Sequence, residues 1–304
     1  MSTLSAVRGL RLSLPATSAN LGPGFDAAGL ALSMRLTVEA RVAAGFQIQA
    51  TGRDSELCGS VEKNLMLEAY RDVLWRADAV VLPLHVKLHN EIPLGMGCGS
   101  SAAALVAGVA LADHFGDLKM GDAGIVAEAS RIEGHPDNVA ACWYGGFTVS
   151  AEDGDTVQVA TFAGDAGWEM LLAVQVASLA TTKARALLPE SYSKADAIFN
   201  VQRASLLVAA FAQGRLDLLA AAMQDRMHQP YRMDACPLLK ALLPLTAEPE
   251  IAGVALSGAG PSVLVFLAAK TTLLEAETRL RELVGPEVEL LPLRIGRGVE
   301  RTLL

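Results

Sequence analysis

Hydrophobic and polar residues alternate along the chain with two periods, and the period separates strands from helices. In the first half, alternation with period two predicts strands over Leu10–Leu14, Met34–Val42, Phe46–Thr51, Leu84–Leu88 and Gly145–Ser150. Helical periodicity predicts helices over Asn64–Trp75, Ser100–His114 and Asp122–Glu133. Between the first two strands, Pro15–Asp26 is rich in Pro, Gly and Asn and predicts a long loop. Pro136 is expected to stop the third helix from continuing, since proline breaks a helix interior.

The second half mixes strands and helices in an irregular order. Strands are predicted over Met170–Val176, Gly253–Leu256, Ser262–Leu267 and Glu287–Leu293, and helices over Ser193–Gly214, Leu216–Met227, Pro237–Thr246 and Thr271–Val284. A polar stretch with a D-G-D turn, Glu152–Gly167, separates the halves and predicts a domain boundary near residue 160. Because the elements do not follow strict β-α-β alternation, the pattern predicts an α+β protein with domains over 1–160 and 161–304.

Composition and charge exclude several classes of protein. The 304 residues are 52% hydrophobic and 19% charged, enough to bury a core, so disorder is not expected. The net charge of −8, without a basic run, argues against a nucleic-acid surface. The longest apolar run, Ala102–Ala112, is too short to span a bilayer, and Arg8 and Arg11 interrupt the N-terminal apolar stretch. The four cysteines form no C-x-x-C pair. We expect a cytoplasmic protein with reduced thiols and no membrane partner.

The stretch I-P-L-G-M-G-C-G-S-S-A, residues 92–102, places a glycine cluster directly before an alanine-rich helix. One interpretation is a tight turn without room for Cβ atoms. The other is a phosphate site, because Gly95, Gly97 and Gly99 would let the backbone approach an anion. Ser100 or Ser101 would cap the helix, whose free N–H groups and dipole favour negative charge.

Two well-known glycine loops fit this stretch poorly. The Walker pattern needs a lysine before Ser100, and none is present. The Rossmann pattern is formally matched by Gly97–Ala102. However, a Rossmann first strand is buried on both faces, whereas the preceding strand here carries His85, Lys87 and His89 on one face.

Three motifs together resemble those of the GHMP kinases, in the order found in that family. They are P-A-T-S-A-N-L-G-P-G-F-D at residues 15–26, P-x-x-x-G-x-G-S-S-A at 93–102 and L-S-G-A-G-P-S at 256–262. Three further stretches resemble the homoserine kinases within that family: G-H-P-D-N-V-A at 134–140, T-T-K-A-R at 181–185 and H-Q-P-Y-R at 228–232. The resemblance implies an N-terminal ribosomal-protein-S5-like domain carrying the phosphate loop, and a C-terminal ferredoxin-like α/β sandwich.

The resemblance also implies an activity and a set of site residues. The activity is transfer of the ATP γ-phosphate to the side-chain hydroxyl of L-homoserine, in threonine biosynthesis, with ATP and Mg²⁺ as cofactors. ATP would bind to Asn64, Pro93, Leu94, Gly95, Met96, Gly97, Cys98, Gly99, Ser100, Ser101 and Ala102. Ser101 and Glu133 would hold Mg²⁺, with Glu128 as a rival to Glu133. A solvated helix face is the alternative for either glutamate.

The acceptor would bind to Asn20, Asp26, His135, Asp137, Asn138, Arg185 and Arg232. Asp137 and Arg185 are the catalytic candidates, and it stays open whether Asp137 is a true base or in-line placement suffices. The carboxylate of homoserine favours a guanidinium group, which can form two parallel hydrogen bonds to it, and Arg185 and Arg232 are the candidates. Simpler interpretations are turn-forming Asp and Asn residues and surface arginines.

Other functions share these motifs. A mevalonate or sugar kinase would keep the fold and change the acceptor, but two arginines favour an amino acid. An inactive relative that senses ATP or threonine would not need Ser101, Glu133 and Asp137. The oligomeric state stays open, with a homodimer as one option. Cys98 replaces the leucine usual in the family, and a thiol there is expected to make the enzyme sensitive to alkylation.

Overall fold

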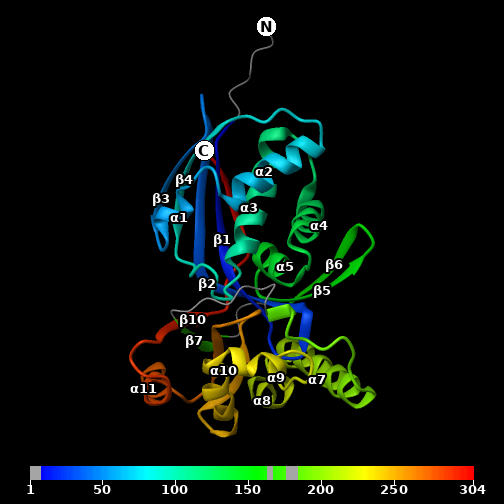
Figure 1. Cartoon of the computed structure of the whole chain (residues 1–304), viewed down its shortest axis with the longest axis vertical. Helices are drawn as coiled ribbons and strands as arrows, with labels where there is room; N and C mark the ends of the chain where they lie inside the picture. Colours follow the sequence, from blue (N-terminus) through cyan, green and yellow to red (C-terminus); the bar gives the residue numbers. More distant parts are fainter. Residues whose placement is uncertain (1–7, 163–166, 176–183) are drawn as a thin grey trace.

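The computed structural model describes residues 8–162, 167–175 and 184–304. Figure 1 shows two domains stacked along the long axis, with the N-terminal sheet and its helices in the upper half. The C-terminus lies in this upper half. No helix in the described part of the chain is long and apolar enough to cross a membrane.

Over the described residues, seven strands form the N-terminal sheet. These are β1 (Leu10–Asn20), β2 (Gly24–Val42), β3 (Gln47–Gly52), β4 (Leu84–Asn90), β5 (Phe147–Asp153), β6 (Thr156–Phe162) and β11 (Glu300–Leu303). The order is β11-β1-β2-β4-β3, with β5 paired to β2 and to β6. β4, which leads into the glycine loop, is antiparallel to β2. β4 is also parallel to β3, so it lies in a mixed sheet, whereas a Rossmann first strand lies in a mostly parallel one.

Helices cover one face of this sheet (Figure 1). They are α1 (Ser55–Cys58), α2 (Leu65–Arg76), α3 (Ser100–Gly116), α4 (Gly121–Glu133) and α5 (Asp137–Tyr144). The central helix, α3, contacts α2, α4, α5 and β1. Its alanine- and valine-rich sequence is buried on almost every side, as expected for a helix that is apolar all round. The site-forming start of α3 is therefore held rigidly by the core.

The second domain is built on a four-stranded antiparallel sheet in the order β10-β7-β9-β8. Its strands are β7 (Glu169–Val174), β8 (Ile251–Leu256), β9 (Val263–Leu267) and β10 (Glu289–Arg294). Its helices are α7 (Lys194–Gln213), α8 (Leu219–Ala222), α9 (Gln229–Arg232), α10 (Pro237–Leu242) and α11 (Leu273–Val284). Short 3₁₀ segments cover Leu216–Leu218, Met233–Ala235 and Leu243–Ala247.

Both faces of the second sheet are buried, which accounts for its unbroken apolar strands. Met170 and Leu172 on β7 belong to the same core as the first domain, while Leu171 and Ala173 face a separate core with α10 and α11. A stack of Phe147 on Phe211, with ring centroids 4.0 Å apart, joins the two domains. The domains therefore share one continuous hydrophobic contact.

The predicted α+β class is confirmed, and so are most predicted elements, but the Pro15–Asp26 loop is wrong. β1 continues to Asn20 and β2 starts at Gly24, so only a tight turn separates them. Register shifts within the β1–β2 pair accommodate the residues that looked loop-like. The predicted helix over Leu216–Met227 is reduced to a 3₁₀ turn and the short α8.

Several elements were not predicted, among them α5, β6 and β11. α4 ends at Glu133, where Gly134 adopts the left-handed conformation, so the helix ends before Pro136 is reached. Pro136 is instead the N-cap of α5, because proline is tolerated where a helix starts. The hairpin strand β6 lies in the polar stretch, so the predicted boundary after residue 160 falls inside it. The last strand, β11, pairs with β1 and returns the chain to the first sheet.

Candidate active site

The glycine loop requires glycine for two reasons that the structure shows. Gly95, Gly97 and Gly99 all have positive φ, between 69° and 74°, a region that other residues rarely adopt. A Cβ atom on Gly97 would collide with the carbonyl of Ser257, and one on Gly99 with the side chain of Thr17. Gly95 and Gly97 line the cleft described below, where such a loop leaves backbone available to an anion.

The predicted capping of α3 by a serine is wrong. The N-cap is Gly99, and no side chain caps the helix. Ser100 and Ser101 instead occupy the first turn, where backbone N–H groups have no partner within the helix. The start of α3 thus presents free N–H donors and the positive end of the helix dipole to the cleft.

The loop containing Ser257, residues 257–262, locks the glycine loop in place. Ser257 Oγ donates to the Gly97 carbonyl at 2.7 Å, and the Ser262 amide donates to the Met96 carbonyl at 3.4 Å. The Gly258 amide donates to the Ala19 carbonyl at 3.2 Å. The third motif of the sequence therefore joins the second domain to both other motifs.

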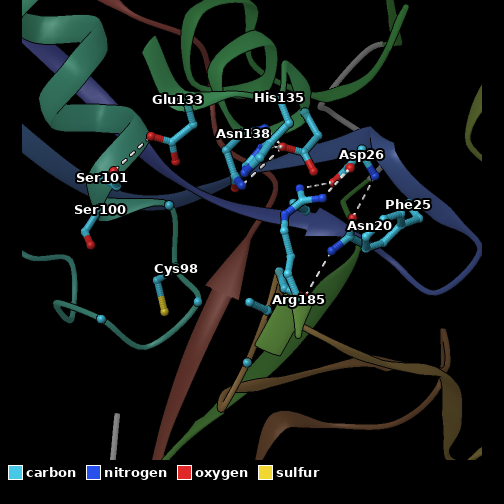
Figure 2. Close-up of a pocket in the computed structure, with 18 of the residues that line it drawn as sticks. Asn20, Phe25, Asp26, Cys98, Ser100, Ser101, Glu133, His135, Asn138 and Arg185 are labelled. Atoms are coloured by element: carbon cyan, nitrogen blue, oxygen red, sulfur yellow. Dashed lines mark hydrogen bonds and ion pairs between the residues drawn. The ribbon is translucent and has the colours of Figure 1, made fainter. Parts of the chain in front are cut away.

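Ser101 and Glu133 meet at the start of α3. Ser101 Oγ donates to Glu133 Oε2 at 2.9 Å (Figure 2). Burial raises the pKa of Glu133 above its usual value, and the hydrogen bond from Ser101 opposes that rise. The rival Glu128 lies on the same helix, but its carboxylate pairs with Arg131 and Arg76 and does not line the cleft. The geometry thus favours Glu133 as the anionic ligand for a cation.

Asp137 is the centre of a hydrogen-bond cluster. Its Oδ1 atom accepts from the Asn138 amide at 2.6 Å and lies 2.7 Å from His135 Nδ1. Burial lowers the pKa of His135, but the Asp137 hydrogen bond and nearby carboxylates outweigh this and raise it above its ordinary value. Asn138 in turn accepts from Thr17 at 2.7 Å. These contacts hold Asp137 rigidly, and no hydrogen bond occupies its Oδ2 atom within the described chain.

Asp26 and Arg185 form an ion pair across the cleft. The two guanidinium nitrogens of Arg185 lie 3.0 and 2.7 Å from the two Asp26 oxygens, and these bonds raise the pKa of Arg185. The amide of Asp26 donates to Asn20 Oδ1 at 3.0 Å, and Asn20 Nδ2 donates to the Gly258 carbonyl at 3.0 Å. Both Asn20 and Asp26 have positive φ, so the β1–β2 turn is a strained, closely held segment.

Arg232 is almost completely buried, at 2% exposure, yet it has no carboxylate partner among the residues the structure describes. Its donors reach the Ala184 carbonyl at 3.3 Å, the Gly258 carbonyl at 3.3 Å and His228 Nδ1 at 3.2 Å. Burial and, next, the charge of Arg185 lower its pKa. A buried cation without a counter-ion favours an anionic ligand.

These groups line one cleft of about 330 Å³ between the domains (Figure 2). The predicted site residues that line it are Asn20, Asp26, Gly95, Gly97, Cys98, Gly99, Ser100, Ser101, Glu133, His135, Asp137, Asn138, Arg185 and Arg232. At one end stand the glycine loop and the Ser101–Glu133 pair. At the other stand Asp26 and the two arginines. The cleft thus has one end lined by the glycine loop and the start of α3, and another end with charges of both signs.

Five predicted ATP-binding residues do not line the cleft: Asn64, Pro93, Leu94, Met96 and Ala102. Asn64 caps α2 by accepting from the Leu67 amide, and its Nδ2 donates to the Cys58 carbonyl. The Leu94 amide donates to Asp54, which anchors the start of the glycine loop. Residues 181–183 of the T-T-K-A-R motif lie outside the described residues.

The sequence prediction missed five residues that line the cleft: Ala19, Phe25, Gly258, Ala259 and Gly260. Phe25 lines the cleft between Asn20 and Asp26, and Ala259 lies in the loop of the third motif. Phe25 belongs to the motif at residues 15–26, but the sequence around an aromatic residue next to glycine does not show which part of the protein its ring contacts. Asp26, His135 and Asp137 also bring possible metal-ligand atoms within 4.8 Å of one another. Because His135 Nδ1 is bonded to Asp137 Oδ1, we assign no metal to this trio.

Comparisons with known proteins show the family to which the chain belongs. The GHMP kinases N terminal domain family matches residues 64–146, and the GHMP kinases C terminal family matches residues 207–284. The chain belongs to the GHMP kinase family. It is 48% identical to a homoserine kinase of Solibacter usitatus over 258 residues, or 84% of each protein. It is 39% identical to a homoserine kinase of Thermus thermophilus over 95% of this chain and 97% of that one.

Solved structures show the same two-domain fold. A homoserine kinase from Cytophaga hutchinsonii superimposes with a TM-score of 0.80 over 99% of this chain and 100% of its own, at 24% identity. A mevalonate kinase from L. major, solved with R-mevalonate, gives 0.70 over 94% and 95% at 16% identity. At these identities the likeness concerns the fold, and the choice of acceptor depends on the cleft of each GHMP kinase.

Proposed function

We propose that this GHMP kinase transfers the γ-phosphoryl group of ATP to the side-chain hydroxyl of L-homoserine, giving O-phospho-L-homoserine and ADP. The proposal is supported by the curated homoserine kinases that are 48% and 39% identical to the chain. The observation that carries it is the buried Arg232 guanidinium, which has no carboxylate partner in the described residues and lies in the same cleft as the glycine loop.

The charges at the acceptor end match an amino acid. A free α-carboxylate would supply the missing counter-ion for Arg232 and add a charge-assisted hydrogen bond. Asp26 supplies a carboxylate for the α-ammonium, and Arg185 holds that carboxylate in a fixed orientation. Mevalonate has a carboxylate for Arg232 but no ammonium for Asp26, and a sugar offers neither group.

The phosphate end of the cleft would hold the nucleotide. The free N–H groups at the start of α3 and the backbone of the glycine loop form an anion site for the ATP phosphates. Ser101 Oγ and the Glu133 carboxylate offer hard oxygen ligands, which suit Mg²⁺. The ion, when bound, would offset negative charge on the phosphates. ATP and Mg²⁺ are therefore the cofactors we propose.

Phosphoryl transfer requires in-line placement of the hydroxyl more than covalent help from the protein. The hydroxyl oxygen forms a bond to the γ-phosphorus while the bond between that phosphorus and the β–γ bridging oxygen breaks. Asp137 Oδ2, which has no hydrogen bond within the described chain, is placed to accept the hydroxyl hydrogen. His135 and Asn138 hold the other oxygen, so the carboxylate is oriented before substrate binds.

A coupled assay of ADP release tests the proposal. Purified protein with ATP and Mg²⁺ is given L-homoserine, L-serine, L-threonine, mevalonate or galactose in turn. We expect the highest kcat/KM with L-homoserine, weak turnover of the shorter or branched hydroxy amino acids, and much less with mevalonate or galactose. Preferential turnover of a sugar would show that the acceptor is wrong. ADP release that no acceptor stimulates would favour an inactive, ligand-sensing relative.

A further inference from the structure

His228 joins two parts of the cleft although it does not line it. Its side chain is completely buried. Nε2 lies 2.7 Å from the Gly22 carbonyl, in the β1–β2 turn, and Nδ1 lies 3.2 Å from Nη1 of Arg232, one helical turn further along the chain. The same ring therefore contacts the turn that carries Asn20 and Asp26 and the arginine that lacks a counter-ion.

The partners of His228 fix its tautomer. A carbonyl oxygen can only accept a hydrogen bond, so Nε2 must carry the proton that is donated to Gly22. A guanidinium can only donate, so Nδ1 must be the unprotonated acceptor for Arg232. His228 is therefore a neutral imidazole that gives one hydrogen bond and receives one. A protonated ring would set an N–H donor against the guanidinium of Arg232.

The backbone that carries His228 is held by Asp225. The Asp225 carboxylate accepts from the amides of Met227 at 2.7 Å, His228 at 2.9 Å and Gln229 at 2.7 Å. Asn200 Nδ2 also donates to it, at 2.9 Å. Four donors on one buried carboxylate leave the turn before α9 little freedom, so the ring position is set before any ligand binds.

The ring of Phe25 completes the arrangement. It lies 5.3 Å from the His228 ring, between centroids. The guanidinium carbons of Arg185 and Arg232 lie 5.4 and 5.5 Å from the Phe25 centroid, within cation–π range. Phe25 thus supports both arginines, while His228 contacts Arg232 alone.

We propose that His228 is a positioning residue for the acceptor. Its neutral ring accepts one edge of the Arg232 guanidinium and so directs the remaining N–H edge toward the carboxylate of the substrate. Its bond to Gly22 keeps α9 in register with the β1–β2 turn, so that the arginine and the Asp26 carboxylate stay at a fixed spacing. This inference depends on the proposed function, since it concerns how an amino-acid acceptor is bound.

Three substitutions separate the two hydrogen bonds. His228→Asn keeps an acceptor near the Nδ1 position, His228→Gln keeps a donor near the Nε2 position, and His228→Phe keeps only the ring shape. We expect Phe and Gln to raise the KM for homoserine about tenfold, with the KM for ATP unchanged and a smaller effect on kcat. His228→Asn should restore most of the lost affinity. Equal effects of Asn and Gln, or a matching rise in the KM for ATP, would overturn the positioning role.

A double-mutant cycle with Arg232→Leu tests whether His228 acts through that arginine. In the Arg232→Leu background, His228→Phe should raise the KM for homoserine by less than about twofold, because the hydrogen bond is already lost. Additive effects would overturn the inference. The wild type is assayed first, so failure of the proposed function shows as absent homoserine turnover.

A second measurement keeps the inference testable without activity. Nitrogen NMR of protein labelled at histidine reports which ring nitrogen of His228 carries the proton, with His228→Gln identifying its signals. We expect a neutral ring protonated at Nε2 in the folded wild type at neutral pH. A proton on Nδ1 would contradict the hydrogen bond to Arg232 and end the proposal.

Discussion

Ser101 Oγ and Glu133 Oε2 lie 2.9 Å apart, although 32 residues separate them in the chain. The first turn of α3 and the last residue of α4 bring two hard oxygen atoms to the edge of the glycine loop. Burial raises the pKa of Glu133, so its charged form is disfavoured until a cation is near. A pair of this kind is suited to a divalent ion that also contacts phosphate.

Removing either oxygen should weaken the binding of Mg²⁺. We expect Ser101→Ala and Glu133→Gln to lower kcat at least about tenfold and to raise the Mg²⁺ concentration needed for half-maximal activity. Glu128→Gln is the matched control on the same helix, because its carboxylate pairs with arginines away from the cleft. Titration of Mg²⁺ at saturating ATP measures the shift. If Glu128→Gln were the damaging change, the metal assignment would move to that residue.

Arg232 should govern the acceptor and spare the nucleotide. A guanidinium–carboxylate hydrogen bond contributes about 1.5–3 kcal/mol, or about tenfold to a hundredfold in affinity. Arg232→Leu should therefore raise the KM for homoserine by that factor and leave the KM for ATP nearly unchanged. Arg232→Lys should recover only part of the lost affinity for homoserine, because an ammonium group cannot form the two parallel hydrogen bonds that a guanidinium makes to a carboxylate. A normal KM for homoserine with impaired ATP binding would assign Arg232 to the phosphates instead.

His228 should make folding stability sensitive to acid. Burial lowers the pKa of His228, with Arg232 adding to the effect and Asp225 opposing it. The unfolded chain titrates near its ordinary value of about 6.5, so between the folded and unfolded pKa values the unfolded state binds more protons. The neutral ring therefore makes its full contribution to the free energy of unfolding above about pH 6.5. Below that pH the contribution falls by up to about 1.4 kcal/mol per pH unit.

Denaturant unfolding from about pH 7.5 down to pH 5 checks this sign. The wild type should lose more free energy of unfolding over the acid range than His228→Gln or His228→Asn, which have no group to protonate there. The comparison of slopes remains valid if the variants are less stable at neutral pH. Parallel curves for wild type and variants would show that His228 titrates equally in both states.

The sequence predicted the site better than it predicted the elements that carry it. Ser101, Glu133, Asp137 and Arg185 lie in one cleft as expected, because each stood in a motif with a chemical reason for its residue types. The Pro15–Asp26 segment was wrongly predicted as a loop, since its Pro, Gly and Asn residues also fit strand ends joined by a tight turn.

Other features depend on contacts between residues far apart in the chain, which the local pattern of hydrophobic and polar residues does not reveal. The four-residue strand β11 is exposed along its length, and its pairing with β1 depends on residues almost 300 positions away. Asn64 looked like a nucleotide ligand, but its side chain caps α2. His228 gave no signal of its own, because the role of a buried histidine depends on Gly22 and Arg232, which only the fold brings together.

Cys98 should be inert toward alkylating reagents, contrary to what its place in the glycine loop suggested. The residue is 1% exposed, and burial raises the pKa of its thiol to about 12. At pH 8, a thiol with that pKa is ionised in only about one molecule in ten thousand, and the thiolate is the reactive form. Cys58 is half-buried and provides the internal comparison.

Iodoacetamide treatment of the folded protein at about pH 8, followed by peptide mapping, measures both thiols together. We expect Cys58 to be modified first and Cys98 to stay unmodified until the chain is denatured, with activity retained. Cys58→Ser should remove the fast labelling. Cys98→Leu, which places the residue usual in the family, should keep the KM for ATP within about threefold, because Cys98 fills the same apolar space beside Ser262. Faster labelling of Cys98 than of Cys58, with loss of ATP binding, would mean that the glycine loop opens to solvent and that the packing by residues 257–262 does not hold it closed.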